Sequence, residues 1–374
     1  MILIFGGTTE GRIAIQTLEE AGKTFYYSTK GDEQDVLLHN GIRLQGAMDA
    51  IEIETFCAQH HIKLLIDAAH PFATQLHETL EQVSVESNIP VIRFERIFPK
   101  RDEEHITWCR DYDDAIEKIQ KEKIFILLAL TGVQTIGKLK PLWQNACCYF
   151  RILDRDSSRK LAREQGFSEK NLYYYTPGED AILLKESGIS GGFCEKVEAA
   201  RQLGIRIFAI CRPKTSDKFI CVNGEHGLRR IIEKHLPDFF PLRSGLTTGT
   251  CAAAAAVAAT WDVFNIYFKK RPTEFPVVLP NGETIQVPVE PQRHIPHSDL
   301  LENGDGMFET SATVIKDAGD DPDITNGMKV VANIAIPFRI DDPLPEDTPQ
   351  DDYNIIVCGG EGVGVVTMPG LGLE

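Results

Sequence analysis

The stretch ILIFGGTTEGR, residues 2–12, decides the fold of the first part of this chain. Its four leading apolar residues suit a short buried strand, a glycine pair follows them, and a helical pattern begins near Glu10. A strand that passes through a glycine turn into a helix is typical of a parallel α/β sheet, where such a turn can approach a pyrophosphate. The spacing is not G-x-G-x-x-G, so a tight turn and a nucleotide loop are equally good interpretations.

Short apolar runs and helical patterns continue to alternate as far as residue 240. This rhythm predicts parallel sheets with helices on both faces. The polar stretch PKRDEEHITW (99–108) interrupts it, so we expect two Rossmann-like parallel-sheet domains, residues 1–100 and 101–238, with a cleft between them. The expected strands after the first are 24–28, 63–67, 90–94, 124–130, 148–153, 171–175 and 205–211.

The charge of the chain changes near residue 240. Of the net charge of −16, residues 243–374 carry −12, from 8 Lys and Arg against 20 Asp and Glu. The stretch HLPDFFPLRSG (235–245) has two prolines at the same point, as a junction between domains often does. We therefore expect a third domain over residues 243–374. The acidic balance argues against a nucleic-acid partner, which would need a basic stripe.

Targeting and metal signals are not evident. No apolar run approaches the length of a membrane span, and Met1 leads directly into a strand-like run without a basic segment. The nine cysteines include no C-x-x-C pair and no zinc spacing. We predict a cytoplasmic protein without a membrane partner, with reduced thiols and no structural metal.

Ligands of parallel sheets bind beyond the carboxyl ends of the strands, so the residues that follow each strand are the candidates for function. Asp67 ends one expected strand, and His70 stands just before Pro71 in AAHPFA (68–73). A single histidine is more often packed or solvated, and only the position at a strand end favours a role in catalysis. We take Asp67 and His70 as catalytic candidates, with His70 as the proton donor and water as the alternative.

Basic residues also gather at strand ends and beside a loop rich in small residues. Each one singly is best explained by an ordinary salt bridge or a solvated side chain, but together they suggest an anionic ligand. The loop before the helix that carries Lys196 adds backbone amides to this set. The predicted substrate-binding residues are Arg93, Arg96, Arg151, Lys185, Ser187, Gly191, Gly192, Lys196 and Arg212.

The ordered motifs GGTTEGR (6–12), DAAHPFA (67–73), IRFER (92–96), KESGISGGFCEKVEAA (185–200) and CRP (211–213) resemble precorrin-6A reductase, of cobalamin (corrin ring) biosynthesis. The resemblance covers nearly all of residues 1–236. It implies an oxidoreductase that transfers hydride from NADH or NADPH to one double bond of a corrinoid macrocycle, which carries many carboxylates. The cofactor residues that it implies in the first loop are Gly6, Gly7, Thr8, Thr9, Glu10, Gly11 and Arg12.

One departure from the family concerns the choice of cofactor. Relatives place serine, alanine, glycine and arginine after the second strand, whereas this chain has STKGDEQD (28–35). Ser28, Lys30 and Asp32 are therefore further cofactor candidates. An acid in this place commonly accepts the ribose hydroxyls of NAD, whereas an arginine suits the phosphate of NADP. We expect use of NADH, or a relaxed preference.

Three later motifs resemble the opening part of cobalt-precorrin-5B C1-methyltransferase, which uses S-adenosylmethionine. They are RSGLTTGTCAAAAAVAA (243–259), KDAGDDPDITNGMKV (316–330) and CGGEGVGVVTMPGL (358–371). The resemblance implies a bifunctional fusion in which a partial α+β methyltransferase-like domain follows the reductase. Members of that family continue beyond the last motif, so we expect an incomplete domain that does not methylate alone. The implied motif residues are Thr247, Thr248, Gly249, Thr250, Asp317, Gly319, Asp320, Asp321, Gly360 and Gly362.

Two alternatives remain open at this point. The α/β pair could be a nucleotide-dependent enzyme for another anionic metabolite, since a glycine loop and arginines would serve that function as well. The chain could also be a non-catalytic scaffold that binds a corrinoid and passes intermediates to other cobalamin-pathway enzymes. Binding spectra with a corrinoid would separate the first alternative from the reductase, and a hydride-transfer assay would separate the second.

Overall fold

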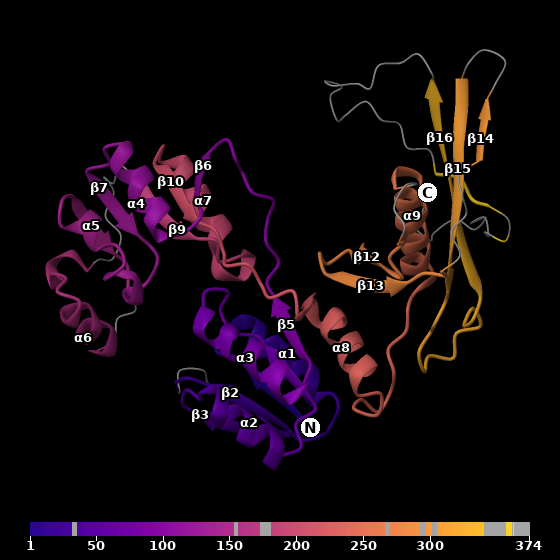
Figure 1. Ribbon diagram of the computed structural model, residues 1–374, viewed down its shortest axis with the longest axis horizontal. Coiled ribbons are helices and arrows are strands. Elements are labelled where there is room, and N and C mark those ends of the chain that lie inside the picture. The colour runs from indigo at the N-terminus through magenta and orange to yellow at the C-terminus, as the bar shows by residue number, and fades with distance from the viewer. Residues whose placement is uncertain are drawn as a thin grey trace, which may run out of the picture.

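The computed structural model describes residues 1–31, 36–152, 156–172, 181–265, 270–291, 297–300, 305–339, 357–360 and 362. These residues form three parts, each with sheets of its own. Figure 1 shows a parallel sheet near the N-terminus, a second parallel sheet in magenta, and an antiparallel part in orange.

The first sheet has six parallel strands in the order β11-β5-β4-β1-β2-β3. Helices α1 and α8 cover one face and α2 and α3 cover the other. Its strands are β1 (Ile2–Phe5), β2 (Phe25–Thr29), β3 (Gly41–Gln45), β4 (Leu64–Asp67), β5 (Val91–Glu95) and β11 (Ile220–Asn223), and its helices are α1 (Thr9–Glu19), α2 (Ala50–Gln59), α3 (Thr74–Ser87) and α8 (Gly224–His235).

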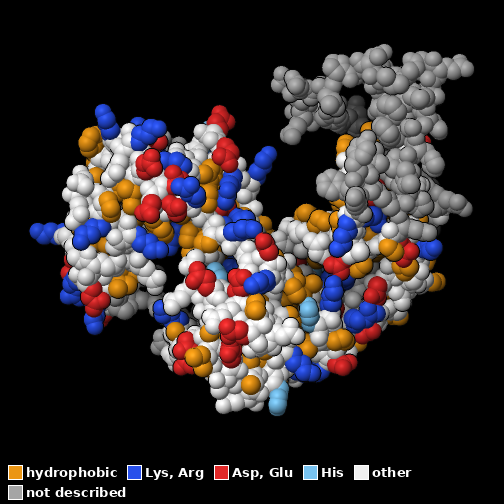
Figure 2. Space-filling view, viewed as in Figure 1, with side chains coloured by type: hydrophobic (Ala, Val, Ile, Leu, Met, Phe, Trp, Pro, Cys, Tyr) orange, Lys and Arg blue, Asp and Glu red, His pale blue; other side chains and the backbone are white. Residues whose placement is uncertain are grey.

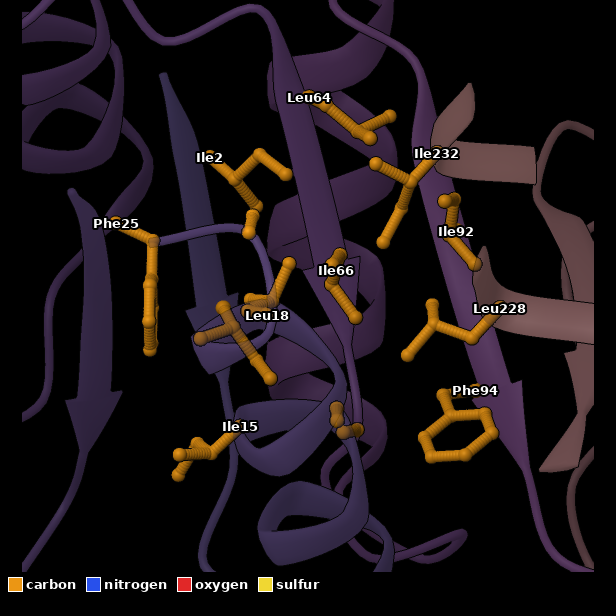
Figure 3. Close-up of a cluster of buried hydrophobic side chains, with 14 of the residues drawn as sticks. Ile2, Ile15, Leu18, Phe25, Leu64, Ile66, Ile92, Phe94, Leu228 and Ile232 are labelled. Carbon is orange, nitrogen blue, oxygen red and sulfur yellow. The ribbon is translucent and has the colours of Figure 1, made fainter. Parts of the chain in front are cut away.

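Aliphatic side chains from α1, α8 and the central strands form the core on one face of this sheet. Figure 3 shows Ile15 and Leu18 of α1 and Leu228 and Ile232 of α8 pointing toward Ile66 and its neighbours. These side chains are at most 1% exposed. Each stabilises the fold by about 1.5–3 kcal/mol relative to an exposed position. This packing keeps the carboxyl ends of the central strands in fixed positions.

The second sheet has five parallel strands in the order β6-β10-β9-β7-β8. Helix α7 covers one face, and α4, α5 and α6 pack against the other. The strands are β6 (Ile106–Cys109), β7 (Ile126–Ala129), β8 (Cys147–Phe150), β9 (Ala181–Lys185) and β10 (Arg206–Ile210). The helices are α4 (Tyr112–Lys121), α5 (Lys140–Trp143), α6 (Asp156–Glu164) and α7 (Phe193–Gln202), with short 3₁₀ turns η1 (Val133–Thr135), η2 (Glu169–Asn171) and η3 (Ile189–Gly191).

The third part is antiparallel and is built around one alanine-rich helix. Its small side chains let α9 pack closely on the long hairpin of β15 and β16. A second hairpin, β12 with β13, lies beside α8, as Figure 1 shows. The elements are α9 (Thr248–Phe264), β12 (Glu274–Val278), β13 (Thr284–Pro288), β14 (His297–Leu300), β15 (Asp305–Ile315) and β16 (Lys329–Arg339).

The prediction of parallel α/β sheets is confirmed, but the chain does not divide where the sequence indicated. After the second sheet it returns to the first, where β11 pairs with β5 and α8 packs beside α1. The expected second domain, residues 101–238, therefore includes β11 and α8, although residues 220–235 belong structurally with residues 1–95. Of the strand expected at 171–175, residue 171 ends η2, residue 172 makes an isolated bridge, and the rest lies outside the described residues.

Candidate functional site

The glycine loop lies at the carboxyl end of β1, as expected. Gly6 packs so closely that an added Cβ would lie 2.4 Å from the ring of Tyr27. Gly7 has a φ of +99°, a conformation that favours glycine, and its N–H donates to the Tyr27 hydroxyl at 3.1 Å. Thr9 and Arg12 are exposed in the first turn of α1. The loop thus presents glycine backbone, a hydroxyl and a guanidinium at a helix start.

Thr8 fixes the entry into α1. Its hydroxyl accepts a hydrogen bond from the Gly11 N–H at 3.0 Å and donates to the carbonyl of Ala68 at 2.6 Å. Gly11 lies against the loop, because a Cβ there would be 3.1 Å from the Cα of Gly6. This turn needs small residues, and its backbone amides and the helix N-terminus favour phosphate oxygens.

Glu10 has a different role from the cofactor contact that the motif suggested. Its buried carboxylate accepts from the Nε of Arg96 at 3.0 Å and from the hydroxyl of Ser190. The guanidinium of Arg96 also donates to the carbonyl of Ser187 at 2.7 Å, and the Ser187 hydroxyl donates to the Gly191 carbonyl. Because Glu10 and Arg96 follow strands of the first sheet and Ser187 and Ser190 follow β9, these contacts join the carboxyl ends of the two sheets.

Asp67, predicted as catalytic, lies fully buried at the end of β4 with its oxygens already engaged. It accepts from Arg93 at 2.8 Å, from Nδ1 of His77 at 2.6 Å and from the Ala69 N–H at 3.1 Å. Burial alone would raise the pKa of Asp67, but the His77 hydrogen bond and the Arg93 charge hold it below its ordinary value. Arg93, predicted to bind substrate, is buried against Asp67 and Glu95. The geometry therefore gives this pair a structural role.

His70 lies beyond β4, where the sequence placed it, but in a state that does not suit a proton donor. Its Nδ1 accepts from the Phe72 N–H at 3.2 Å. Burial, and then the positive charges of Arg96, Lys185 and Arg93, lower the pKa of His70 from 6.5 to about 3. The imidazole is therefore neutral at physiological pH, with its proton on Nε2, and can donate a hydrogen bond but holds no spare proton.

The second sheet contributes the cations that the sequence predicted. Lys185 ends β9, and Arg151 follows directly after the end of β8 rather than lying inside that strand. Lys196, in α7, donates to the carbonyl of Gly191 at 2.9 Å. Burial first, and then the charge of Arg151, lower the pKa of Lys196. Gly192 has a φ of +67° at the start of α7, so the chain turns sharply beneath these cations.

Arg212 contacts other protein groups at the position where the sequence predicted substrate binding. Its guanidinium donates to Glu186 at 2.7 Å and lies 3.7 Å above the ring of Phe98. Glu186 also binds Arg101 at 2.8 Å. Arg212 therefore braces the connection between the sheets, in place of the substrate contact expected from its position at a strand end.

The edge of the first sheet holds the remaining cofactor candidates. Ser28 is buried in β2, with its carbonyl accepting a hydrogen bond from the first glycine of the loop at 3.1 Å. Lys30 is exposed just beyond this strand, and Asp32 lies outside the described residues. Arg43, on the neighbouring β3, donates to a carbonyl beside Lys30 at 3.5 Å. Two cations thus flank the end of β2.

The first two motifs of the third part come together at the N-terminus of α9. The Thr247 hydroxyl caps the helix by accepting from the Thr250 N–H at 3.1 Å. Lys316, only 3% exposed, donates to Thr248 at 3.2 Å and pairs with Asp323. Gly249 lies in the first turn of α9. A hydroxyl-rich loop and a buried lysine therefore face each other here.

A second set of contacts closes the same loops. Arg243 donates to Asp317 at 3.0 Å, and its N–H donates to Asp320 at 2.7 Å. Gly319 has a φ of +64°, and a Cβ there would lie 2.4 Å from the Arg243 carbonyl. These loops border a cavity of about 700 Å³. It is lined by Leu242, Arg243, Ser244, Gly245, Leu246, Thr247, Thr248, Lys316, Ala318, Asp320, Asp321, Pro322 and Asp323.

Little of the third motif can be placed. Gly360 and Gly362 are described, but most of their neighbours lie outside the described residues. Gly362 has a φ of +80°, and a Cβ at either glycine would meet nothing within 4 Å among the described atoms. Their predicted part in a methyltransferase-like site stays a prediction.

Sequence reasoning missed several residues that the site depends on. His77 gave no signal, because it lies within a helical pattern of polar residues. Arg43 was overlooked because β3 is half-exposed and has no apolar run. Glu186 and Ser190 stand in the quoted loop after β9, so the rule that ligand residues follow strands would have included them.

Among the described residues, metal ligands and thiols indicate no further site. All nine cysteines lie in described stretches and are free. Glu225, His226 and Glu283 approach one another closely enough to hold a metal, but Glu283 already accepts from the backbone N–H groups of Glu225 and His226. The expected lack of a structural metal stays a prediction. Within the described part of the chain, no helix has both the length and the apolar character that crossing a membrane requires.

Two parallel sheets that meet at their carboxyl ends, with a glycine loop on one and cations on both, define a two-domain α/β enzyme of the nucleotide-binding class. Residues 1–226 match the family described as precorrin-6x reductase CbiJ/CobK, and the chain belongs to this family. Residues 234–374 match the CbiD family. Both resemblances drawn from the sequence are thereby confirmed.

Curated relatives match the same two parts of the chain separately. The cobalt-precorrin-6A reductase of Priestia megaterium is 28% identical over 57% of this chain and 91% of its own length. That of Methanocaldococcus jannaschii is 28% identical over 57% of this chain and 90% of its own. The cobalt-precorrin-5B C(1)-methyltransferase of Prosthecochloris aestuarii is 38% identical over 36% of this chain, which spans only 30% of that relative.

The fold itself has a counterpart among solved structures. CobK precorrin-6A reductase superposes with a TM-score of 0.50 and 18% identity, over 63% of this chain and 96% of that one. At this identity the likeness supports the fold alone. It agrees with the arrangement of the two parallel sheets described above.

Proposed function

We propose that this chain reduces precorrin-6A, or its cobalt form, to the corresponding precorrin-6B with NADH or NADPH. The observation that carries the proposal is the meeting of the two sheets at their carboxyl ends, joined by Glu10 and Arg96. Lys185, Lys196 and Arg151 stand at the same ends of the second sheet. Positive groups from both sheets suit a macrocycle that carries many carboxylates, in a protein whose net charge is −16.

The face of the molecule that Figure 2 shows has no broad basic surface among its described residues. Figure 2 shows acidic and basic side chains intermingled over the face of the molecule in view. A ligand with many carboxylates would therefore be recognised at the site, where Arg96, Lys185 and Lys196 are half-buried or buried. Partly desolvated cations attract an anion more strongly than exposed ones do.

The glycine loop is the proposed place for the cofactor. Gly6 and Gly11 let the loop fold tightly, Gly7 leaves its backbone open to a ligand, and Thr9 and Arg12 are exposed to hold phosphate or ribose oxygens. A bound nicotinamide supplies the hydride, while the residues of this chain orient the macrocycle and provide the proton.

The experiment that tests the proposal is anaerobic oxidation of NADH and of NADPH by the whole chain, with and without cobalt-precorrin-6A. Absorbance of the nicotinamide and mass of the macrocycle are followed together. Cofactor oxidation coupled to a macrocycle heavier by one hydride and one proton is the expected result. Folded protein that binds the macrocycle but oxidises neither cofactor would contradict the proposal and favour a non-catalytic carrier.

A second candidate function concerns the third part. Its cavity of about 700 Å³ is large enough for S-adenosylmethionine and is bordered by motif residues such as Thr247, Thr248 and Asp320. The chain spans 30% of the methyltransferase relative from Prosthecochloris aestuarii, and we propose that this cavity binds S-adenosylmethionine. Calorimetric titration of the whole chain with S-adenosylmethionine tests this, and a null titration would rule it out.

A further inference from the structure

Lys185 differs from Arg96 and Lys196, the other buried or half-buried cations named at the meeting of the sheets. It is the last residue of β9, and its ammonium lies 5.2 Å from the centre of the Phe72 ring. Arg96 is bound by Glu10 and Lys196 by the carbonyl of Gly191. Within the described stretches of the chain, by contrast, the half-buried Lys185 ammonium has neither an ion pair nor a hydrogen bond.

The groups around Lys185 leave it without a counter-ion. His70, whose pKa the charge of Lys185 helps to lower, is neutral, and Lys138 adds positive charge beside Lys185. The adjacent Glu186 is held away by Arg101 and Arg212. Burial first, and then the charge of Lys138, lower the pKa of Lys185 from 10.5 to about 8. The ammonium is therefore mostly protonated at neutral pH, yet releases its proton more readily than an ordinary lysine.

Resting on the proposed function, we propose that Lys185 is the catalytic acid that protonates the macrocycle while the cofactor reduces it. One carbon of the double bond receives hydride from the nicotinamide, which is oxidised, and its neighbour receives a proton from the Lys185 ammonium. The double bond becomes a single bond, Lys185 is left as a neutral amine, and solvent restores its proton.

The structure offers a reason for choosing Lys185 over His70. A half-buried ammonium without a partner can turn toward a substrate, and its loss of charge on giving up the proton is favoured by burial and by the charge of Lys138. The Nδ1 of His70 is occupied by the Phe72 N–H, so its neutral ring can only orient a group through Nε2. His70 is then a positioning residue in this scheme.

The test compares two substitutions at Lys185 in the whole chain. Lys185→Arg keeps the positive charge but holds its proton at every accessible pH. We expect it to lower kcat by about a hundredfold or more, with KM changed less than about threefold. Lys185→Met removes the charge as well and should also raise KM. If Lys185→Arg retains kcat within about twofold of the wild type, the lysine serves only as a charge and the proposal is overturned.

A neighbouring residue provides the matched control. In the wild type, kcat/KM should fall as pH rises through about 8, because the protonated lysine is the active form. Lys138→Gln removes the nearby positive charge, so the same decline should move to higher pH while the enzyme stays active. A decline that stays in place in Lys138→Gln, or that persists in Lys185→Arg, would assign it to another group.

A readout that does not depend on turnover completes the design. Acetylation of Lys185 by acetic anhydride, followed across pH by peptide mass spectrometry, reports its deprotonation directly. We expect a midpoint near 8, moving upward in Lys138→Gln, and a midpoint near 10.5 would overturn the proposal. If wild-type protein fails to reduce the macrocycle, the proposed function fails and this inference falls with it. If wild type turns over and Lys185→Arg does as well, only the inference fails.

Discussion

The Nε of Arg96 donates to the carboxylate of Glu10 at 3.0 Å, and both side chains are more than nine-tenths buried. Glu10 lies in the first turn of α1 and Arg96 follows β5, yet both reach the loop after β9 in the second sheet, through Ser190 and Ser187. This ion pair therefore fixes how the carboxyl ends of the two sheets meet. It does so in the middle of the proposed site, where a shift of the sheets would separate the cofactor from the macrocycle.

Glu10→Ala should destabilise the reductase part strongly. The substitution leaves the Arg96 guanidinium buried without its counter-ion, which costs about 3–5 kcal/mol in free energy of unfolding. Urea unfolding followed by circular dichroism measures the change. The control is Glu122→Ala, which removes an exposed partner of Arg206 at 2.9 Å and should cost less than about 1 kcal/mol. Equal losses in the two variants would show that Glu10 and Arg96 do not hold the sheets together.

Asp67 should make the free energy of unfolding of the first sheet depend on pH in the acid range. Its pKa is lowered in the folded protein, so its ionised form stabilises the fold above the ordinary value of 3.8, and this contribution is lost as pH falls below that value. Asp67→Asn leaves Arg93 underpaired and should lower stability by about 3–5 kcal/mol at neutral pH.

Urea unfolding midpoints between neutral pH and pH 2 provide the measurement for Asp67. The wild-type midpoint should decline more steeply in the acid range than that of Asp67→Asn, because the variant has no proton to take up at this position. Parallel acid declines in both proteins would place the responsible carboxylate elsewhere.

The two sheets were predictable from the sequence because buried parallel strands appear as unbroken apolar runs, such as residues 2–5 and 64–66. The return of β11 to the first sheet could not be predicted. Its sequence, ICVN, is short and half-exposed, and no local pattern indicates which strand it pairs with. The position of residues just after strands identified the candidate residues, but it could not show what role each one has. Arg93 and Arg212 resemble Lys185 in sequence, and only the partners Asp67 and Glu186 show that the arginines are occupied.

Arg43 should favour NADPH over NADH. Burial raises the pKa of the Tyr27 hydroxyl while the charges of Arg43 and Arg12 act in the opposite direction, so both guanidiniums lie near the glycine loop. With Lys30 beside them, they offer charge for a phosphate at the end of β2, whereas Asp32 in the sequence suits a ribose hydroxyl. These opposed features support the expectation of relaxed cofactor use.

Steady-state kinetics of Arg43→Gln with both cofactors tests this balance. The KM for NADPH should rise about tenfold, which corresponds to about 1.4 kcal/mol, while the KM for NADH changes less than about twofold. Arg206→Gln, which removes an exposed arginine of the second sheet, is the control and should alter neither value. A rise of equal size for both cofactors would mean that Arg43 does not act on the phosphate.

Gly224→Ala should loosen the third part from the reductase. Gly224 has a φ of +69° at the start of α8, and a Cβ there would lie 1.9 Å from the carboxylate carbon of Glu283. That carboxylate, from the loop before β13, accepts from the N–H groups of Glu225 and His226 and so caps α8 from the other domain. Displacing it removes a helix cap worth about 0.5–2 kcal/mol and one of the contacts that hold the hairpin beside α8.

Gly204→Ala separates this clash from backbone strain. Gly204 has a φ of +65°, and a Cβ there would meet nothing within 4 Å, so its substitution carries the conformational cost alone. Limited proteolysis near residues 236–247 should proceed faster in Gly224→Ala than in Gly204→Ala, because only the first frees the hairpin from α8. Equal rates would mean that Glu283 contributes nothing to docking, and the contacts of Glu233 with Ser244 would then have to hold the third part in place.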